Sequence, residues 1–261
     1  MAGAFSGETA GYYARYRRGY PDSVVDALAG SLGLTSADVV LDLGCGTGQL
    51  TMPIARHARV AIGMDPEPDM LAHARAAARE AGSENTLWML GSDDDLGGLR
   101  FLTGDGALGA VTIGNAIHLM AHQRLFTQVR PMLRIGGGLA VIANGTPLWQ
   151  QDSEPSRALK LALEQWLDTT LTSCCGTDRE SRGTYADSMR AAGFDVSEVV
   201  TEYYGELDLE HIVGGVYSAM SPDSLPAADR RAAFAAHIAG ALPETPFVEH
   251  VRVAAMIGRI R

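Results

Sequence analysis

The stretch from Val39 to Thr51, VVLDLGCGTGQLT, joins a short apolar run to a glycine-rich turn. The run that ends at Leu43 is typical of a parallel strand covered on both faces. The turn has a glycine at every second position: Gly44, Gly46 and Gly48. Glycines permit backbone torsions and a close ligand approach that a Cβ would prevent, and Thr47 can cap a helix that follows. An ordinary strand–turn–helix corner needs one glycine rather than three, so the stretch predicts a βαβ nucleotide site with the acid Asp42 beside it.

The residues from Asp42 to Gly48, DLGCGTG, resemble the first motif of the class I S-adenosylmethionine-dependent methyltransferases. The resemblance implies a Rossmann-like α/β fold, in which a seven-stranded, mostly parallel sheet has helices on both faces and helical lid insertions. It also implies that the cofactor is S-adenosyl-L-methionine. The resemblance is strong from Val39 to about Ile142 and weak over the later insertions.

A nicotinamide or flavin dinucleotide site is the alternative interpretation of this turn. Its fingerprint, G-x-G-x-x-G or G-x-G-x-x-A, needs a small third residue because helix and strand pack closely there. Gln49 stands at that place, and its amide would obstruct the packing. Asp42 gives a pyrophosphate no partner, whereas it complements the sulfonium and ammonium charges of adenosylmethionine. The turn therefore favours adenosylmethionine.

A second apolar run, from Val60 to Met64, ends at Asp65. This acid follows Gly44 by about 20 residues, the spacing at which a carboxylate ending the second strand accepts both ribose hydroxyls. The alternative role of Asp65, as N-cap of the next helix, fits Asp69 better. The cofactor-binding candidates that the resemblance implies at matching positions are Tyr12, Tyr16, Arg17, Asp42, Gly44, Cys45, Gly46, Thr47, Gly48, Asp65, Pro66, Met70, Ser92, Asp93, Asp94, Asn115 and His118.

The segment from Tyr12 to Pro21 holds four tyrosines and three arginines within ten residues. It resembles the Y-x-x-x-R-x-x-Y-P segment that folds over the cofactor as a lid in many small-molecule methyltransferases. At matching positions Arg17, with Tyr12 or Tyr16, would approach the carboxylate end of the cofactor. Arg18 stands where that pattern usually has proline. Taken without the family, the segment is equally typical of a solvated arm whose tyrosines pack on the body of the protein.

A loop rich in aspartate, from Ser92 to Asp95, follows the third predicted strand. In the resembling family the matching loop wraps the adenine, and one acid accepts from its amine, which implies Asp93 or Asp94. A run of acids is as often a solvated loop.

The fourth predicted strand leads to Asn115 and His118. The carboxyl ends of parallel strands line the ligand crevice, so we expect both side chains to face the site. His118 is then the first candidate for a general base, because imidazole titrates near neutral pH. His211 is the second candidate and Tyr16 the third. A lone histidine after an apolar strand is also often a hydrogen-bonded structural residue.

The remaining pattern predicts one domain with helical additions. We expect an N-terminal lid arm at 1–21, a cofactor-binding core at 22–145, and helical insertions at 146–183 and 206–245 that form the acceptor pocket. The expected strands are 39–43, 60–64, 86–90, 109–115, 139–143, 196–204 and 248–257, and the expected helices are 22–32, 48–57, 69–81, 123–133, 185–192, 208–220 and 227–241. The large side chains that could line the pocket or simply pack in the core are Trp149, Trp166, Tyr203, Tyr204, Tyr217 and Met220.

The charge balance restricts the partners. The chain has 21 Lys and Arg against 31 Asp and Glu, a net charge of −10, which opposes phosphate-backbone binding and favours a small acceptor over RNA or DNA. The cysteines Cys45, Cys174 and Cys175 offer neither a disulfide framework nor metal-finger spacing, which favours a reducing compartment. Neither a signal-peptide pattern nor a run of 18 apolar residues occurs. We therefore expect a cytoplasmic protein without membrane contact, and a homodimer is left open.

The predicted function is methyl transfer from S-adenosyl-L-methionine to an O, N or C atom of a small metabolite, such as an intermediate of secondary metabolism. No metal is expected, because the fourth and fifth strands end in Asn115 and Asn144 without neighbouring aspartates. The alternative is a protein that binds the cofactor without transferring its methyl group, either as a regulator or in another reaction.

Overall fold

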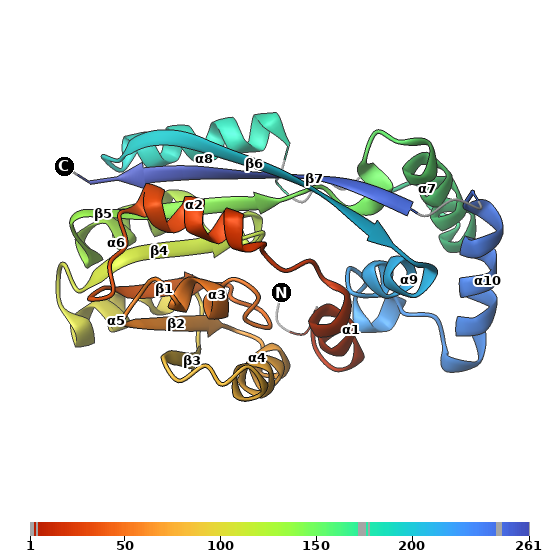
Figure 1. The fold of residues 1–261 in the computed structure, drawn as a ribbon, viewed down its shortest axis with the longest axis horizontal. Coiled ribbons are helices and arrows are strands. Elements are labelled where there is room, and N and C mark those ends of the chain that lie inside the picture. Colours follow the sequence, from red (N-terminus) through yellow and green to blue (C-terminus); the bar gives the residue numbers. More distant parts are fainter. Residues whose placement is uncertain (1–2, 4, 172–175, 177, 244–246, 261) are drawn as a thin grey trace.

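A seven-stranded sheet of order β3-β2-β1-β4-β5-β7-β6 forms the centre of the computed structural model (Figure 1). The structure describes residues 3, 5–171, 176, 178–243 and 247–260. The strands are β1 (Val39–Leu43), β2 (Val60–Asp65), β3 (Thr86–Leu90), β4 (Leu108–Gly114), β5 (Leu133–Asn144), β6 (Asp195–Leu207) and β7 (Phe247–Arg259). Strands β1 to β5 are parallel to one another, and β7 is antiparallel to both of its neighbours. The predicted mostly parallel sheet is thus confirmed.

The helices cover both faces of this sheet and extend beyond one end of it (Figure 1). They are α1 (Glu8–Tyr16), α2 (Asp22–Leu32), α3 (Thr51–Ala55), α4 (Pro68–Glu80), α5 (Leu96–Thr103), α6 (His122–Val129), α7 (Glu154–Leu167), α8 (Arg179–Ala191), α9 (Leu209–Tyr217) and α10 (Arg231–Ala241). Short 3-10 turns are η1 (Asp93–Asp95), η2 (Ile117–Leu119), η3 (Arg130–Met132), η4 (Leu148–Gln150), η5 (Pro222–Ser224) and η6 (Ala228–Arg230).

The alternation of side chains along β1 divides the core into two layers. Val40 packs among the residues of α2 and α3, whereas Leu41 and Leu43 pack on the side of α6 and α8. All three side chains are fully buried, as expected for a central strand covered on both faces. Asp42 shares the face of Val40, so its carboxylate points towards α3 rather than into solvent.

A third hydrophobic cluster lies in the lobe formed by α7, α9, α10 and η4, at the end of the sheet where β6 and β7 reach beyond β1 (Figure 1). Phe234 and Ile238 of α10 are fully buried there, and Trp166 packs edge-on against Phe234 with ring centroids 5.2 Å apart. Tyr12 of α1 packs on the same cluster. The arm therefore connects the lobe with the sheet.

Four predicted helices are shorter than their sequence patterns suggest, namely those expected over 48–57, 123–133, 208–220 and 227–241. The helix expected over 48–57 is confined to α3, because the glycine turn continues through Gly48 and Leu50 precedes the first helical residue. Thr47 accordingly caps no helix, and its hydroxyl is buried without a hydrogen-bond partner among the described residues. The helix expected over 123–133 ends as α6 at Val129, and Pro131 follows in η3, since proline cannot continue the α-helical hydrogen bonding.

None of the helices in the described part of the chain combines the length and hydropathy that a bilayer span requires. Cys45 is a free, buried cysteine. The prediction for Cys174 and Cys175 falls outside the described residues.

Candidate functional site

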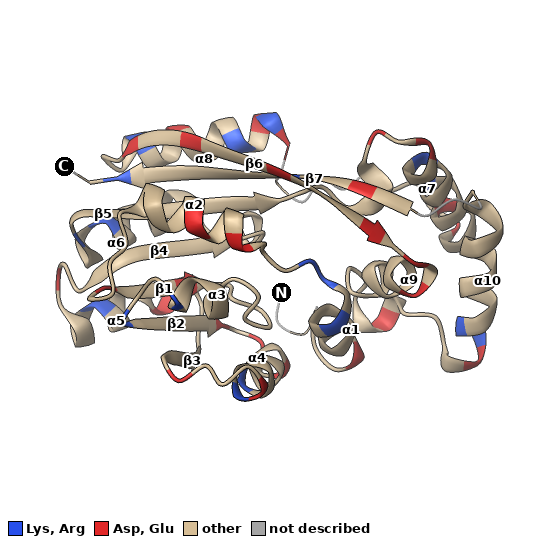
Figure 2. Cartoon of the chain, viewed as in Figure 1, with Lys and Arg blue, Asp and Glu red and all other residues tan. Residues whose placement is uncertain are grey.

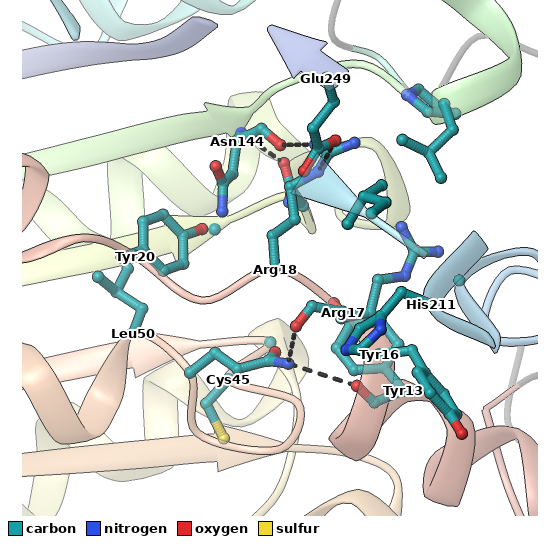
Figure 3. A pocket seen from close by; sticks show the side chains of 18 of the residues that line it. Tyr13, Tyr16, Arg17, Arg18, Tyr20, Cys45, Leu50, Asn144, His211 and Glu249 are labelled. Atoms are coloured by element: carbon teal, nitrogen blue, oxygen red, sulfur yellow. Dashed lines mark hydrogen bonds and ion pairs between the residues drawn. The ribbon is translucent and has the colours of Figure 1, made fainter. Parts of the chain in front are cut away.

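A cavity opens where the carboxyl ends of β1, β4 and β5 meet the N-terminal arm (Figure 3). It encloses about 810 Å³, its open mouth included. The order of strands reverses between β1 and β4, which is the point at which open α/β sheets bind ligands. The lining residues are Tyr13, Tyr16, Arg17, Arg18, Tyr20, Asp42, Gly44, Cys45, Gln49, Leu50, Gly114, Asn115, Asn144, Pro147, Leu148, Trp149, Leu207, His211, Gly215 and Glu249.

The glycine turn forms one wall of this cavity. Gly44, Gly46 and Gly48 have φ values of 66°, 55° and 83°, all in the left-handed region that favours glycine. A Cβ on Gly44 would lie 2.6 Å from the Cβ of Ala116, which is closer than packed atoms approach. Glycine is therefore required here both by the torsion and by the close approach of the loop after β4.

Asp42 is anchored behind the turn by two threonine hydroxyls. Thr51 donates to Asp42 Oδ2 at 2.6 Å, and Thr112 donates to Oδ1 at 2.7 Å. Burial raises the pKa of Asp42 to about 6, although the two hydroxyl hydrogen bonds act to lower it. A cationic ligand at the turn would favour the ionised form of this carboxyl.

Asp65 flanks the other side of the turn. Its Oδ2 accepts the backbone N–H of Gly46 at 2.9 Å, and its Oδ1 accepts the N–H of Glu67 at 2.9 Å. Burial raises the pKa of Asp65, and these two hydrogen bonds partly offset that effect. The two carboxylates at the ends of β1 and β2 thus lie on either side of one glycine turn.

The arm covers the turn from outside. The ring of Tyr13 would lie 3.6 Å from a Cβ placed on Gly46, and the guanidinium of Arg17 lies 5.1 Å from the centre of that ring. Gln49 donates through Nε2 to the carbonyls of Tyr13 and Arg17, at 3.4 and 3.3 Å (Figure 3). Gln49, which stands where a dinucleotide fingerprint needs a small residue, therefore binds the arm to the turn.

Two further contacts join the arm to the strand ends. Asn144 donates to the carbonyl of Gly19 at 3.1 Å. Arg18 Nε lies 2.8 Å from Glu249 Oε2, and Figure 3 shows Arg18 extending from the arm to Asn144, at the end of β5, and Glu249, near the start of β7.

On one side of the cavity an imidazole of α9 packs against a phenol of α1. His211 Nδ1 lies 2.7 Å from Asp208 Oδ1, and the ring packs edge-on against Tyr16, with centroids 5.7 Å apart. Tyr16 donates its hydroxyl to Glu210 Oε1 at 2.7 Å. Partial burial and this hydrogen bond raise the pKa of Tyr16, which makes it a poor base.

Comparison with known proteins identifies the central part of the chain. The profile of the family described as "Methyltransferase domain" matches residues 40–137, which extend from β1 into the first half of β5. Residues 40–137 are a methyltransferase domain. Over 138 residues the chain is 32% identical to an uncharacterized methyltransferase of Mycobacterium tuberculosis, a match covering 53% of this chain and 51% of that protein. The chain thus spans about half the length of the curated relatives that it matches first.

Solved structures extend the likeness of fold to nearly the whole chain. A candidate type II methyltransferase from Anaeromyxobacter dehalogenans has a TM-score of 0.62 at 20% identity, covering 94% of this chain and 98% of that one. A cyclase has a TM-score of 0.53 at 19% identity, covering 92% of this chain and 81% of that one. The methyltransferase domain and its helical additions therefore have the predicted Rossmann-like class I fold.

The structure brings together part of the predicted site. Seven of the predicted residues line the cavity: Tyr16, Arg17, Asp42, Gly44, Cys45, Asn115 and His211. The backbone of Asn115 adopts a left-handed conformation at φ 54°, and its side-chain oxygen accepts the N–H of Asn144 at 2.9 Å. Asn115 thus fixes the ends of β4 and β5 relative to each other.

His118 is not among the lining residues of the cavity. It lies in η2, where Ile117 rather than His118 is fully packed into the core, although partial burial of the imidazole lowers the pKa of His118. His118 therefore does not line this cavity together with Asn115, and its role as a base stays a prediction. Tyr12 also lies elsewhere, stacked on Tyr16 and edge-on against Tyr217 in the lobe.

The predicted adenine-binding aspartates contact α6 of the methyltransferase domain. Asp93 lies 3.5 Å from Arg124 and accepts the N–H of Ala121, and Asp94 also pairs with Arg124. Ser92 forms a capping box with Asp95. The remaining predicted residues also lie outside the lining of the cavity. They belong to the glycine turn, to the end of β2 and to the region where α4 begins: Gly46, Thr47, Gly48, Asp65, Pro66 and Met70.

Asp69, which was expected to cap α4, lies inside the helix and instead accepts the N–H of Gly7 at 2.7 Å. It thereby helps to hold the arm.

The large side chains that could line the pocket or pack in the core have different surroundings. Trp149 lines the cavity, whereas Trp166, Tyr217 and Met220 pack in the lobe. Tyr203 packs on the sheet, and Tyr204 is exposed.

The sequence analysis assigned no site role to several lining residues, although three of them belong to the tyrosine- and arginine-rich arm: Tyr13, Arg18, Tyr20, Asn144 and Glu249. Glu249 and Arg18 are more than 200 positions apart, so only the folded chain makes them neighbours. A buried acid in an apolar strand was the single available hint, since Glu249 stands at an inward-facing position of β7.

Proposed function

We propose that this protein transfers a methyl group from S-adenosylmethionine to a small metabolite, such as a natural-product intermediate. The observation that carries the proposal is the left-handed glycine turn held between the carboxylates of Asp42 and Asp65 at the switch point of the sheet. Two acids beside the turn suit a ligand with positive charges and ribose hydroxyls, and they oppose a pyrophosphate.

The arm offers a partner for the carboxylate of such a cofactor. Arg17 lines the cavity, and its buried Nε has no hydrogen-bond acceptor among the described residues. Its charge faces the ring of Tyr13, which stabilises a cation without neutralising it. The residues present therefore fit adenosylmethionine: Asp42 beside the sulfonium, Asp65 at the ribose and Arg17 at the carboxylate.

The chemistry that the bound cofactor supplies is an activated methyl group, open to in-line displacement by an acceptor atom. The protein then has to align the acceptor and, for a hydroxyl or a protonated amine, remove a proton. His211 is placed for that proton transfer, because Asp208 contacts its Nδ1 and leaves Nε2 for the acceptor. His211 therefore replaces His118 as the first candidate base.

The other walls of the cavity favour a small acceptor with an apolar or flat surface. Leu148, Trp149 and Leu207 line the side next to the lobe, and Tyr16 faces them from the arm. In the view of Figure 2 the positions of arginine and lysine along the ribbon are interspersed with those of acids over several helices rather than gathered in one stripe. Together with the net charge of −10, this distribution supports a metabolite rather than RNA as the acceptor.

The test combines binding and turnover. Calorimetry with S-adenosylmethionine, S-adenosylhomocysteine and a nicotinamide dinucleotide should give binding of the first two and none of the third. A metabolite panel should then be screened for formation of S-adenosylhomocysteine. Tighter binding of the dinucleotide would refute the proposal.

A second candidate is a protein that binds the cofactor but catalyses a different reaction. The observation that favours it is the cyclase that shares this fold over most of the chain. The two candidates both require cofactor binding and differ in turnover. Conversion of an acceptor without formation of S-adenosylhomocysteine would select the second candidate, and stoichiometric formation would select the first.

A further inference from the structure

The adjacent arginines Arg17 and Arg18 have different surroundings. Arg18 uses all three of its nitrogens: Nη1 donates to the carbonyl of Asn144 at 2.9 Å, Nη2 donates to the carbonyl of Thr146 at 2.9 Å, and Nε lies 2.8 Å from Glu249 Oε2. Arg17 has no carboxylate or carbonyl partner at its buried Nε among the described residues. Arg18 is thus held by two backbone carbonyls and one carboxylate of the protein, whereas the buried Nε of Arg17 is open to a ligand.

The Arg18–Glu249 pair is buried on the sheet side. The side chain of Glu249 is 3% exposed and that of Arg18 is 21% exposed. Removing one partner of such a pair leaves an uncompensated charge in the interior, which is far more unfavourable than losing a surface pair. The pair therefore constrains where the arm can lie.

The local backbone is fitted to this arginine. Gly145 has φ 72°, and a Cβ on it would lie 2.5 Å from Arg18 Nη1. Only glycine allows both the torsion and the approach of the guanidinium to the end of β5. This observation is independent of the ion pair and indicates the same contact.

We propose that Arg18 is a positioning residue, which docks the arm on the sheet through Glu249 and thereby holds Arg17 and Tyr13 over the glycine turn. The part that concerns Arg17 rests on the proposed function, whereas the docking of the arm does not. Arg15 supplies a matched control, because its pair with Glu210 is exposed on both sides, with side chains 69% and 60% exposed. Surface pairs of that kind contribute little.

The experiment first measures cleavage of the arm by chymotrypsin in the absence of ligand, at its tyrosines. Arg18→Gln, Glu249→Gln and Gly145→Ala should each accelerate cleavage at least tenfold, whereas Arg17→Gln and Arg15→Gln should leave it within twofold of the wild type. Because either single change already breaks the pair, Arg18→Gln combined with Glu249→Gln should be no faster than the single variants. Arg18→Lys should restore part of the protection.

The second measurement is the dissociation constant of S-adenosylhomocysteine. It should rise about tenfold in Arg17→Gln, with the arm still protected, and in Arg18→Gln, with the arm released. If a single substitution unfolds the chain, Arg18→Met with Glu249→Leu removes both charges and restores a folded core for the same assay.

Unchanged arm protection in both Arg18→Gln and Glu249→Gln would overturn the proposal. So would release of the arm by Arg17→Gln, because the two arginines would then share one role. Failure of every variant, including the wild type, to bind S-adenosylhomocysteine would refute the proposed function while the cleavage result still decided the docking of the arm.

Discussion

The carboxylate of Asp65, at the end of β2, accepts the backbone N–H of Gly46, in the turn after β1, at 2.9 Å. The hydrogen bond fixes an acid next to a glycine whose φ of 55° lies in the left-handed region that favours glycine. It thereby sets the position of the turn relative to the second strand, where a ribose would be held.

Replacing Asp65 by alanine should weaken binding of S-adenosylmethionine by about 1.5–3 kcal/mol, or roughly 10- to 150-fold, because two charge-assisted hydrogen bonds to the ribose are lost. Calorimetry measures the change directly. Glu67→Gln serves as the control, since Asp65 contacts only the backbone of that residue. A dissociation constant equal to that of the wild type would remove Asp65 from the site.

The stability of the protein should depend on the ionisation of Asp42. Burial raises its pKa to about 6 from the ordinary 3.8, so the protonated form is favoured in the folded state. The contribution of Asp42 to the free energy of unfolding is fully present below about pH 4 and is lost as the pH rises through 6. The loss approaches about 3 kcal/mol.

Asp42→Asn cannot ionise and should escape that loss. Between pH 4.5 and pH 7.5 the free energy of unfolding of the wild type should therefore fall relative to that of Asp42→Asn. Urea unfolding at several pH values gives this difference. Parallel pH profiles for the two proteins would mean that Asp42 titrates normally.

The two histidine candidates can be separated by kinetics. His211→Asn should lower kcat by about 10²- to 10⁴-fold with cofactor affinity nearly intact, the range expected when a general base is lost. His118→Asn, on the exposed turn η2, should lower kcat by less than about fivefold. The reverse order of effects would return the role of base to His118, and small effects of both would indicate catalysis by proximity alone.

Activity should not require a divalent metal. In the described part of the chain, no three His, Cys, Asp or Glu side chains come together in an arrangement that could hold one. Turnover measured after dialysis against EDTA should equal turnover with added magnesium. Loss of activity in EDTA and its recovery with magnesium would contradict this expectation.

The sequence by itself determined the central half of the fold. The apolar run of β1, the three glycines and the acid ending β2 are local features, and each depends on torsions or side-chain alternation that a short stretch carries. For the same reason the family motif, and the place of Asp42 and Gly44 beside the cavity, could be predicted from the sequence alone.

The sequence did not indicate contacts that depend on residues far apart in the chain. His118 follows a strand that was predicted correctly, yet it lies in a 3-10 turn and does not line the cavity. Asp93 and Asp94 lie in the expected loop, but Arg124, on a helix about 30 positions later, pairs with both carboxylates. Contacts of this kind depend on packing angles that no local pattern records.

Tertiary structure alone decided which residues surround the cavity on the side of the acceptor. Antiparallel β7 enters the sheet between β5 and β6 and brings Glu249 to the carboxyl end of β5, where Arg18 of the arm meets it. Likewise, α9 places His211 beside Tyr16 only because the lobe folds back on the arm. Local torsions and alternation fix the cofactor half within short segments, whereas the acceptor half is assembled from residues up to 231 positions apart.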